Sequence, residues 1–112
     1  SDAYPVFRLG WVADYPDPHT FMNLMTSGSE NNRTGWGHRK YDEFVRKASI
    51  EKDQEERRKM YEAAQKVLVE AEVPVIPIYA GVAHHLISKR VKNYPLNVLT
   101  NYYYNYGVQL GE

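Results

Sequence analysis

The sequence contains no cysteine among its 112 residues, which excludes a disulfide framework and thiolate catalysis. It also lacks an excess of charge of either sign, because 14 Lys and Arg residues balance 14 Asp and Glu residues. A nucleic-acid-binding surface normally needs clustered basic charge, so this balance argues against one. No apolar run approaches the roughly 18 residues of a membrane-spanning helix.

Aromatic residues are abundant, with ten tyrosines, three phenylalanines and two tryptophans. The hydrophobic fraction of 43% and the charged fraction of 25% are normal for a globular domain, and the length suits one domain rather than two. Tyr and Trp are favoured where a ligand or a partner is bound, but they also fill ordinary cores. Composition alone leaves both interpretations open.

Acidic residues mark the starts of two predicted helices. Asp17 precedes Pro18, which matches an N-cap acid followed by proline at the first helical position. Asp53 is followed three residues later by Glu56, which is a capping-box pattern. We therefore expect a short helix after Asp17 and a longer one after Asp53.

Apolar residues at spacings of three and four predict which face of each helix is buried. A polar, glycine-containing loop over 26–38 separates the short helix from a second helix over 41–50, and Pro74 limits the third helix. The residues expected to face the core are Phe21, Leu24 and Met25 in the first helix; Tyr41, Phe44, Val45 and Ala48 in the second; and Met60, Ala64, Val67, Leu68 and Ala71 in the third.

Strands are predicted where β-branched and aromatic residues cluster, over 5–13, over 73–88 as buried strand material, and over 101–110. The order β-α-α-α-β-β indicates a mixed α/β fold. The terminal strand follows irregular sequence without a turn that would pair it to a neighbour. This arrangement suggests a fragment whose sheet is completed by strands elsewhere.

Catalytic and metal sites find little support. Asp14 and Asp17 could form a glycosidase pair, but they lie three residues apart across a proline turn, and Asp17 is better explained as a cap. His84 and His85 would point to opposite faces of a strand, and no other ligand lies at a typical metal spacing from them. We expect no catalytic residue, no metal and no cofactor.

Four linked segments, GWVADYPDPHTFMNLM, SENNRTGW, YDEFVRKA and RRKMYEAAQKVLVEAEVPVIPIY, occur in this order between residues 7 and 90. In order and spacing they resemble the C-terminal part of extracellular oligopeptide-binding proteins. These are the substrate-binding subunits of peptide ABC importers, a family with dipeptide-binding and nickel-binding relatives. The last twenty residues match only loosely, as a tyrosine-rich returning strand.

The resemblance implies a type II, two-lobed periplasmic-binding-protein-like fold, of which this chain is the C-terminal part of the second lobe. Residues 1–90 would belong to that lobe, and residues 91–112 would form a tail strand returning toward the N-terminal lobe. The implied partners are an oligopeptide ligand, the N-terminal lobe and the membrane permease, with no nucleic acid. The implied location is extracytoplasmic, either periplasmic or as a cell-surface lipoprotein.

The resemblance also assigns ligand-binding roles. Asp14 matches the family's acid that pairs with the free α-amino group of the peptide. Trp11, Val12 and Ala13 would line the peptide, chiefly through main-chain groups. Arg8 matches a basic position that in some members helps to receive the peptide's C-terminal carboxylate.

The loop from Asn32 to Trp36 is expected near the cleft in the same family, with Trp36 as the wall of a side-chain pocket. After the PIY segment this sequence has Ala80 and Gly81, where many peptide binders carry further aromatic residues. The pocket there is expected to be roomier, so ligand length is not carried over from the family.

Other interpretations of these residues remain open. Without the resemblance, Asp14 is better explained as an exposed acid that closes a turn. Core packing explains Trp11 at least as well as ligand contact does, and Arg8 is equally well explained as a surface residue of an edge strand. A different solute, such as a sugar or a nickel complex, is one alternative ligand. A small protein–protein interaction module that uses the tyrosine-rich C-terminus is an alternative of another class.

Overall fold

The computed structural model describes residues 5–82, 84–94 and 109–111. The chain divides into two compact units, Ser1–Pro77 and Ile78–Glu112, and each is treated separately. Among the described residues, no helix combines the length and the apolar character needed to span a membrane.

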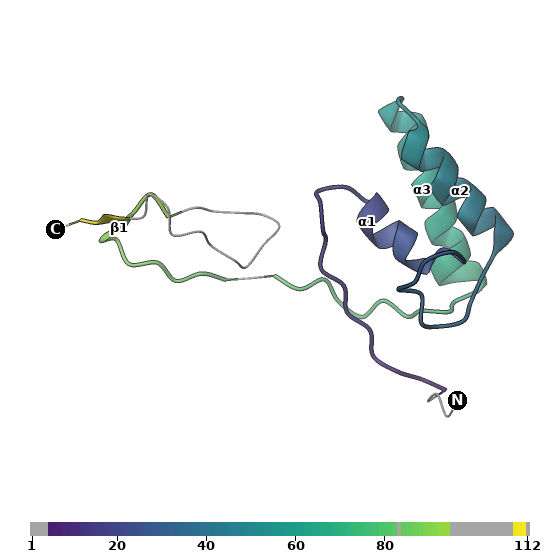
Figure 1. Ribbon diagram of the computed structural model, residues 1–112, viewed down its shortest axis with the longest axis horizontal. Coiled ribbons are helices and arrows are strands. Elements are labelled where there is room, and N and C mark those ends of the chain that lie inside the picture. Colours follow the sequence, from purple (N-terminus) through teal and green to yellow (C-terminus); the bar gives the residue numbers. More distant parts are fainter. Residues whose placement is uncertain (1–4, 83, 95–108, 112) are drawn as a thin grey trace. The chain divides into compact units, whose positions relative to one another are not determined.

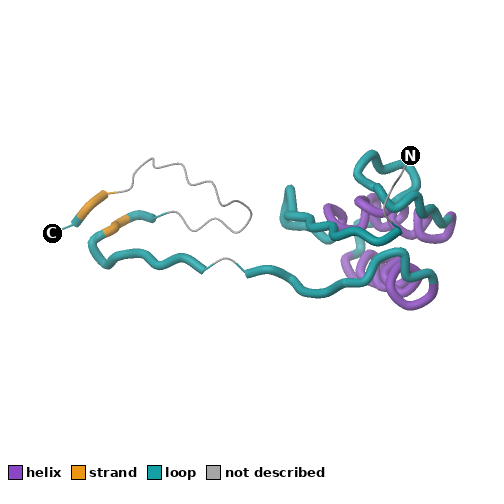
Figure 2. The backbone as a smooth tube through the Cα atoms, turned by 90° about the horizontal axis from the view of Figure 1, so that it is seen from below, coloured by secondary structure: helices purple, strands orange, loops and turns teal. Residues whose placement is uncertain are grey.

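The first unit is a small helical cluster. It contains α1 (His19–Met22), the 3₁₀ turn η1 (Asn23–Met25), α2 (Arg39–Ile50), α3 (Gln54–Lys66) and the π-helical turn η2 (Val67–Ala71). Figure 1 shows α1 lying against the pair formed by α2 and α3. Figure 2 shows long loops leading into and out of this cluster. All three predicted helices are confirmed.

Local capping explains where the long helices begin. α2 starts at Arg39 because the Nδ1 of His38 accepts the Tyr41 amide at 3.4 Å. The Asp53 carboxylate accepts the amides of Glu55 and Glu56 at 3.0 and 2.9 Å, which confirms the predicted cap of α3. The capping box is incomplete, however, because the Asp53 amide donates to Glu51. The chain then leaves helical geometry after η2, three residues before Pro74.

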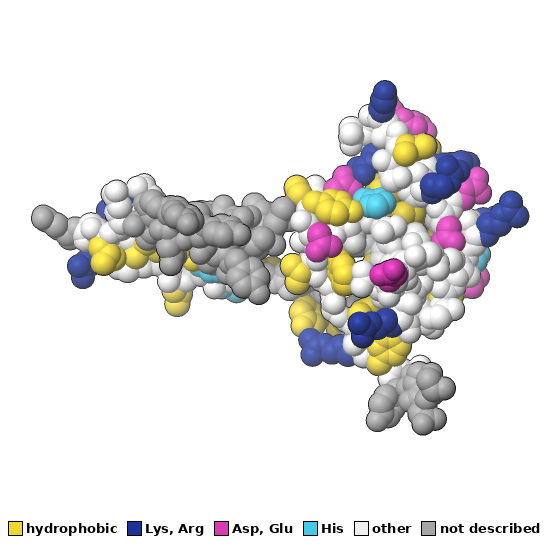
Figure 3. Space-filling model, viewed as in Figure 1, with side chains coloured by type: hydrophobic (Ala, Val, Ile, Leu, Met, Phe, Trp, Pro, Cys, Tyr) yellow, Lys and Arg dark blue, Asp and Glu magenta, His cyan; other side chains and the backbone are white. Residues whose placement is uncertain are grey.

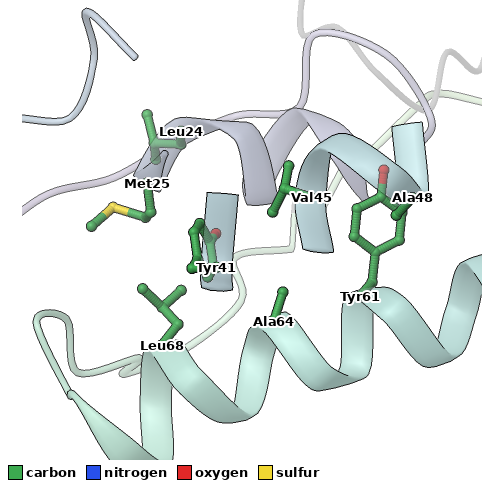
Figure 4. Packing of buried hydrophobic residues seen from close by; sticks show 8 residues of the cluster. All are labelled: Leu24, Met25, Tyr41, Val45, Ala48, Tyr61, Ala64 and Leu68. Atoms are coloured by element: carbon green, nitrogen blue, oxygen red, sulfur yellow. The ribbon is translucent and has the colours of Figure 1, made fainter. Parts of the chain in front are cut away.

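The core forms where α1, α2 and α3 meet. Figure 4 shows Tyr41 between Leu24 and Met25 on one side and Leu68 on the other, while Tyr61 reaches from α3 toward Ala48 of α2. Phe44, Met60 and Val67 pack at the margin, whereas Phe21 and Ala71 are exposed, so the predicted stripes are only partly correct. The buried apolar residues are Leu24, Met25, Tyr41, Val45, Ala48, Tyr61, Ala64 and Leu68.

Tyr41 joins two helices through its hydroxyl group. The hydroxyl donates to the carbonyl oxygen of Met22 at 2.6 Å, and the tyrosine is completely buried. Burial, helped by the neighbouring Asp42 charge, raises the pKa of the Tyr41 phenol far above its ordinary value of 10.0. The phenol therefore stays neutral and acts as a fixed donor between α2 and the end of α1.

The outer faces of α2 and α3 carry alternating acids and bases, which Figure 3 shows interspersed over the surface. Lys47 pairs with Glu43 at 2.7 Å and Lys59 with Glu56 at 2.8 Å, and these side chains are about half exposed. Such exposed pairs are screened by solvent and contribute little to stability. The charge-rich start of α3 is thus largely a solvated face, as its sequence predicts.

The long strands predicted over 5–13 and 73–88 are wrong for this chain. The described residues of both segments have no regular secondary structure. Several of their apolar side chains are exposed, with Val12 at 72%, Ile76 at 78% and Leu86 at 105%. A strand needs a neighbour that satisfies its amide and carbonyl groups and covers its apolar face. No described strand supplies that neighbour.

The second unit contains a two-stranded antiparallel sheet. β1 (Val91–Lys92) pairs with β2 (Gln109–Leu110), with Val91 opposite Leu110. The amide of Gly111 donates to the Arg90 carbonyl oxygen at 2.6 Å and extends the pairing. The end of the chain therefore has a partner strand, contrary to the expectation from its sequence. Most of the tyrosine-rich segment 101–110 lies outside the described residues.

Removing the Tyr41 hydroxyl tests the link between α1 and α2. Tyr41→Phe leaves the Met22 carbonyl without its buried donor, so we expect the free energy of unfolding to fall by about 1–3 kcal/mol. Tyr15→Phe is the matched control, because Tyr15 is 41% exposed and its hydroxyl contacts His19 at the surface. Urea unfolding should separate the two variants. An equally small change in both would contradict the role assigned to Tyr41.

Candidate functional site

The turn that precedes α1 is fixed by Asp17. Its Oδ1 accepts the His19 amide at 2.8 Å, as expected of an acid at a helix start. The same oxygen accepts a hydrogen bond from Nη2 of Arg57 on α3 at 2.7 Å. The bond to Arg57 is the main cause that lowers the pKa of the Asp17 carboxyl below its ordinary value of 3.8. Asp17 is therefore a structural acid of the helical unit.

Arg57 connects three parts of the helical unit. Besides Asp17, its guanidinium donates to the Ala48 carbonyl oxygen at the end of α2 at 3.0 Å and to the Tyr61 hydroxyl at 3.2 Å. The guanidinium carbon lies 5.0 Å from the centre of the Tyr61 ring, a cation–π distance. The Arg57 side chain is only 16% exposed, unlike its neighbours in the charge-rich start of α3. The carboxylate of Asp17 raises the pKa of Arg57.

Asp14 occupies a different environment from Asp17. It is exposed, and its contacts run to Thr20 in the first turn of α1. The Asp14 amide donates to the Thr20 hydroxyl at 3.1 Å, and that hydroxyl donates to Asp14 Oδ2 at 3.4 Å. Thr20 itself is 4% exposed. The Asp14 carboxylate therefore lies at the surface while one of its oxygens contacts the buried Thr20 hydroxyl.

The residues before Asp14 alternate between the core and the surface. Trp11 is half-buried and packs against the hydrophobic core, and its indole Nε1 is buried without a hydrogen-bond partner among the described residues. Val12 is exposed and Ala13 is half-buried. Arg8 is exposed. Residues 7–13 form no strand, and Trp11 packs on the core three residues before the exposed Asp14.

Asn32 organises the loop that carries Trp36. Its side-chain amide donates to the carbonyl oxygens of Met25, Thr26 and Trp36 at 3.2, 3.2 and 2.8 Å. Its Oδ1 accepts the amide and the hydroxyl of Thr34. The side chain of Asn32 is thus occupied by contacts inside the loop, and it fixes the backbone of Trp36.

Trp36 lies between the core and the surface. Its ring meets Tyr41 edge-on, with centroids 5.2 Å apart, and stacks on His38 at 6.0 Å. It is half-buried against the hydrophobic core, although its loop composition suggested a surface contact. Only part of the ring is available to a ligand.

The described residues do not enclose a deep pocket around the predicted site. An open groove of about 320 Å³ is lined by residues of α1, α2 and the intervening loop, among them His19, Asp42 and Arg46. None of the predicted ligand-binding residues lines it. Within the described part of the chain, no group of three or more His, Cys, Asp or Glu side chains could hold a metal ion.

Three curated relatives show how the chain is classified. It is 37% identical over 94 residues to the periplasmic murein peptide-binding protein MppA of Escherichia coli, and 34% identical over 85 residues to the dipeptide-binding protein DppE of Bacillus subtilis. It is 32% identical over 98 residues to YgiS of Escherichia coli, named a probable deoxycholate-binding periplasmic protein. These matches cover 84%, 76% and 88% of the chain.

The chain belongs to the oligopeptide- and dipeptide-binding protein family. The resemblance identified in the sequence is thereby confirmed. The chain spans only 16–18% of the length of these three relatives. No family model matches the sequence, and no solved structure gives a significant match.

Two residues that contact the turn of the predicted site, Thr20 and Arg57, were not predicted from the sequence. Thr20 contacts Asp14, and Arg57 holds the turn around Asp17. Arg57 lies in a run of charged residues that is typical of a solvated helix face, so its sequence context does not distinguish it. Its spacing of four residues from Tyr61, on the face that also carries Ala64, is the signal that could have identified it.

Replacing Arg57 by methionine tests the turn. Because the hydrogen bond to a charged partner is lost and Asp17 stays partly buried, we expect Arg57→Met to lower the free energy of unfolding by about 2 kcal/mol at neutral pH. Arg58→Met is the matched control, since Arg58 forms ion pairs with Glu55 and Glu62 but is 61% exposed. The control should change stability far less than Arg57→Met does, because solvent screens the exposed Arg58 ion pairs.

The same variant predicts a pH dependence. The pKa of Asp17 is lowered in the folded state, so its contribution is present above the ordinary value of 3.8 and is lost as the pH falls through the lower native value. The difference in stability between wild type and Arg57→Met should therefore become smaller in acid, where the contacts of Arg57 with Ala48 and Tyr61 account for what remains. Urea titrations between neutral pH and pH 2 would measure this, and a constant difference would contradict the pairing.

Proposed function

We propose that this chain is the C-terminal part of the ligand-binding second lobe of an extracytoplasmic, non-catalytic peptide-binding protein. In this proposal, Asp14 receives the free α-amino group of a bound oligopeptide. The proposal rests on the different environments of the two acids in the ADYPDP turn. Asp17 is engaged by Arg57 and by the start of α1, whereas Asp14 stands exposed on a fixed backbone.

The chemistry of an exposed, fixed carboxylate suits an ammonium ligand. A charge-assisted hydrogen bond from a primary amine contributes roughly 1.5–3 kcal/mol. A peptide with an acylated N-terminus brings no charge and places its acyl group against the carboxylate. Closure of a second lobe would then leave Asp14 buried and unpaired, which costs affinity. Asp14 thus selects for a free amine without reading side chains.

The other predicted residues take supporting roles. Val12 and the neighbouring backbone of Ala13 are exposed or half-exposed and available for main-chain pairing with an extended peptide. Trp11 has a buried indole donor that requires an acceptor from outside the described residues. Asn32 acts by placing Trp36, which lines a side-chain pocket, and Arg8 receives the peptide carboxylate.

Exposed apolar segments support the placement within a larger protein. Residues 5–12 and 73–87 include several exposed large hydrophobic side chains, such as Val6 at 86% and Ile78 at 85%. In the whole protein, strands of the same lobe would pair with these segments and cover them. Residues 91–112 would return toward the N-terminal lobe. The complete binding protein would reside in the periplasm or at the cell surface, in keeping with the periplasmic names of two relatives. It would deliver its peptide to an ABC permease.

A bile-acid-like ligand is the second candidate, because the YgiS relative is named for deoxycholate. Such a ligand carries a carboxylate and no amine, so it would gain nothing from Asp14. The peptide proposal is therefore favoured over it. An interaction module based on the tyrosine-rich C-terminus is less favoured, since the relatives are named for the peptides or the deoxycholate that they bind.

Calorimetry on the full-length binding protein tests the proposal. A tripeptide with a free N-terminus should bind, while its N-acetylated twin should bind at least about tenfold more weakly, in keeping with loss of the charge-assisted bond. Asp14→Asn should weaken the free tripeptide by a similar factor. Equal affinity for the two peptides would contradict the amine anchor, and deoxycholate binding in their place would move the protein to the second candidate.

The control separates binding from folding. Asp14→Asn should leave the free energy of unfolding nearly unchanged, because Asp14 is exposed. The 112-residue chain alone should bind the tripeptide much more weakly than the full-length protein, since half of the cleft would be missing. Micromolar binding by the isolated chain would overturn the two-lobed placement.

A further inference from the structure

Thr20 is the only non-aromatic polar side chain among the buried residues that the structure describes. It lies in the first turn of α1, six residues after Asp14. A buried hydroxyl requires hydrogen-bond partners, and Thr20 finds its partners on Asp14. The contact is therefore a feature that the helical unit maintains.

We propose that Thr20 is a positioning residue for the ligand carboxylate of Asp14, which deepens the proposed function and rests on it. The Thr20 hydroxyl accepts the Asp14 amide at 3.1 Å and so fixes the backbone of that residue. It also donates its proton toward Oδ2 at 3.4 Å. The amide contact is the stronger of the two, because 3.4 Å is long for a hydrogen bond between oxygens.

The contact leaves one carboxylate oxygen for the ligand. With Oδ2 facing the Thr20 hydroxyl, Oδ1 of Asp14 is the oxygen that would accept the ammonium group. A carboxylate held in one orientation loses less conformational freedom when it binds than a freely rotating one. Thr20 therefore contributes to affinity by preorganising Asp14, without touching the peptide.

The position of Thr20 depends in turn on the start of α1. The Thr20 amide donates to the Asp17 carbonyl oxygen at 3.2 Å, and Arg57 of α3 holds the Asp17 carboxylate. A series of direct contacts thus runs from α3 through Asp17 and Thr20 to the exposed Asp14. The two acids of the turn therefore have linked roles. Asp17 anchors the turn to α3, and Asp14 binds the ligand.

Thr20→Val and Thr20→Ser in the full-length protein test this role. Valine keeps the shape and removes the hydroxyl, whereas serine keeps the hydroxyl. We expect Thr20→Val to weaken the free tripeptide about tenfold and the N-acetylated tripeptide, measured by competition, less than about twofold. Thr20→Ser should restore the selectivity for the free amine. Thr26→Val is the control, since within the described part of the chain that hydroxyl bonds the nearby Asn23 carbonyl oxygen and makes no contact with Asp14.

Each outcome decides between distinct explanations. Equal weakening of both peptides by Thr20→Val, or a serine variant as weak as the valine variant, would reduce Thr20 to a packing role and overturn the proposal. So would a valine variant with wild-type selectivity. If the wild-type protein itself does not prefer the free tripeptide, the proposed function fails, and this result is separate from any effect of Thr20. Thermal unfolding of all variants identifies any that do not fold.

Discussion

The ion pair between Arg57 and Asp17 fixes the turn before α1 on the rest of the helical unit, and the arrangement of the candidate site depends on it. The two residues are separated by 40 positions, and one 2.7 Å contact brings the turn before α1 onto α3. The same guanidinium binds the end of α2 through Ala48. Without it, α1 would be held to the rest chiefly by the small apolar cluster around Tyr41 and by the Tyr41 hydroxyl.

The fixed turn explains why the segment ADYPDP carries two acids that do not share a role. Asp17 is partly buried and neutralised by Arg57, so it adds little to the field at the surface. Asp14 projects from the same turn and keeps its charge accessible. Pro16 and Pro18 restrict the backbone between them. A rigid turn of this kind presents a charge in a defined direction, as recognition of a peptide amine requires.

The sequence predicted the helices well because their signals are local. The Asp53 cap and the spacing of Tyr41, Val45 and Ala48 act within a few residues, and the structure confirms them. The long strands were predicted wrongly because a strand depends on a partner, and no described strand pairs with residues 5–13 or 73–88. Their composition shows only that these segments are rich in β-branched and aromatic residues.

The candidate site likewise contains residues that the sequence indicated and residues that it did not. Asp14 was identified through the family resemblance, whose membership the comparisons confirm, while its ligand role stays a prediction. The roles of Thr20 and Arg57 could not be predicted from the sequence, because they depend on contacts with residues distant along the chain or in another element. Nothing in the sequence near Thr20 indicates that its hydroxyl contacts Asp14. Arg57 is the same residue type as its neighbour Arg58, although Arg57 is mostly buried and Arg58 is exposed.

A double-mutant cycle on Asp17 and Arg57 tests the central claim most directly. Asp17→Asn keeps an oxygen for the His19 amide but removes the charge, and Arg57→Met removes the guanidinium. The account predicts a coupling of about 2 kcal/mol in the free energy of unfolding, since the pair is partly buried and hydrogen-bonded. A coupling below about 0.5 kcal/mol, as for an exposed surface pair, would contradict it.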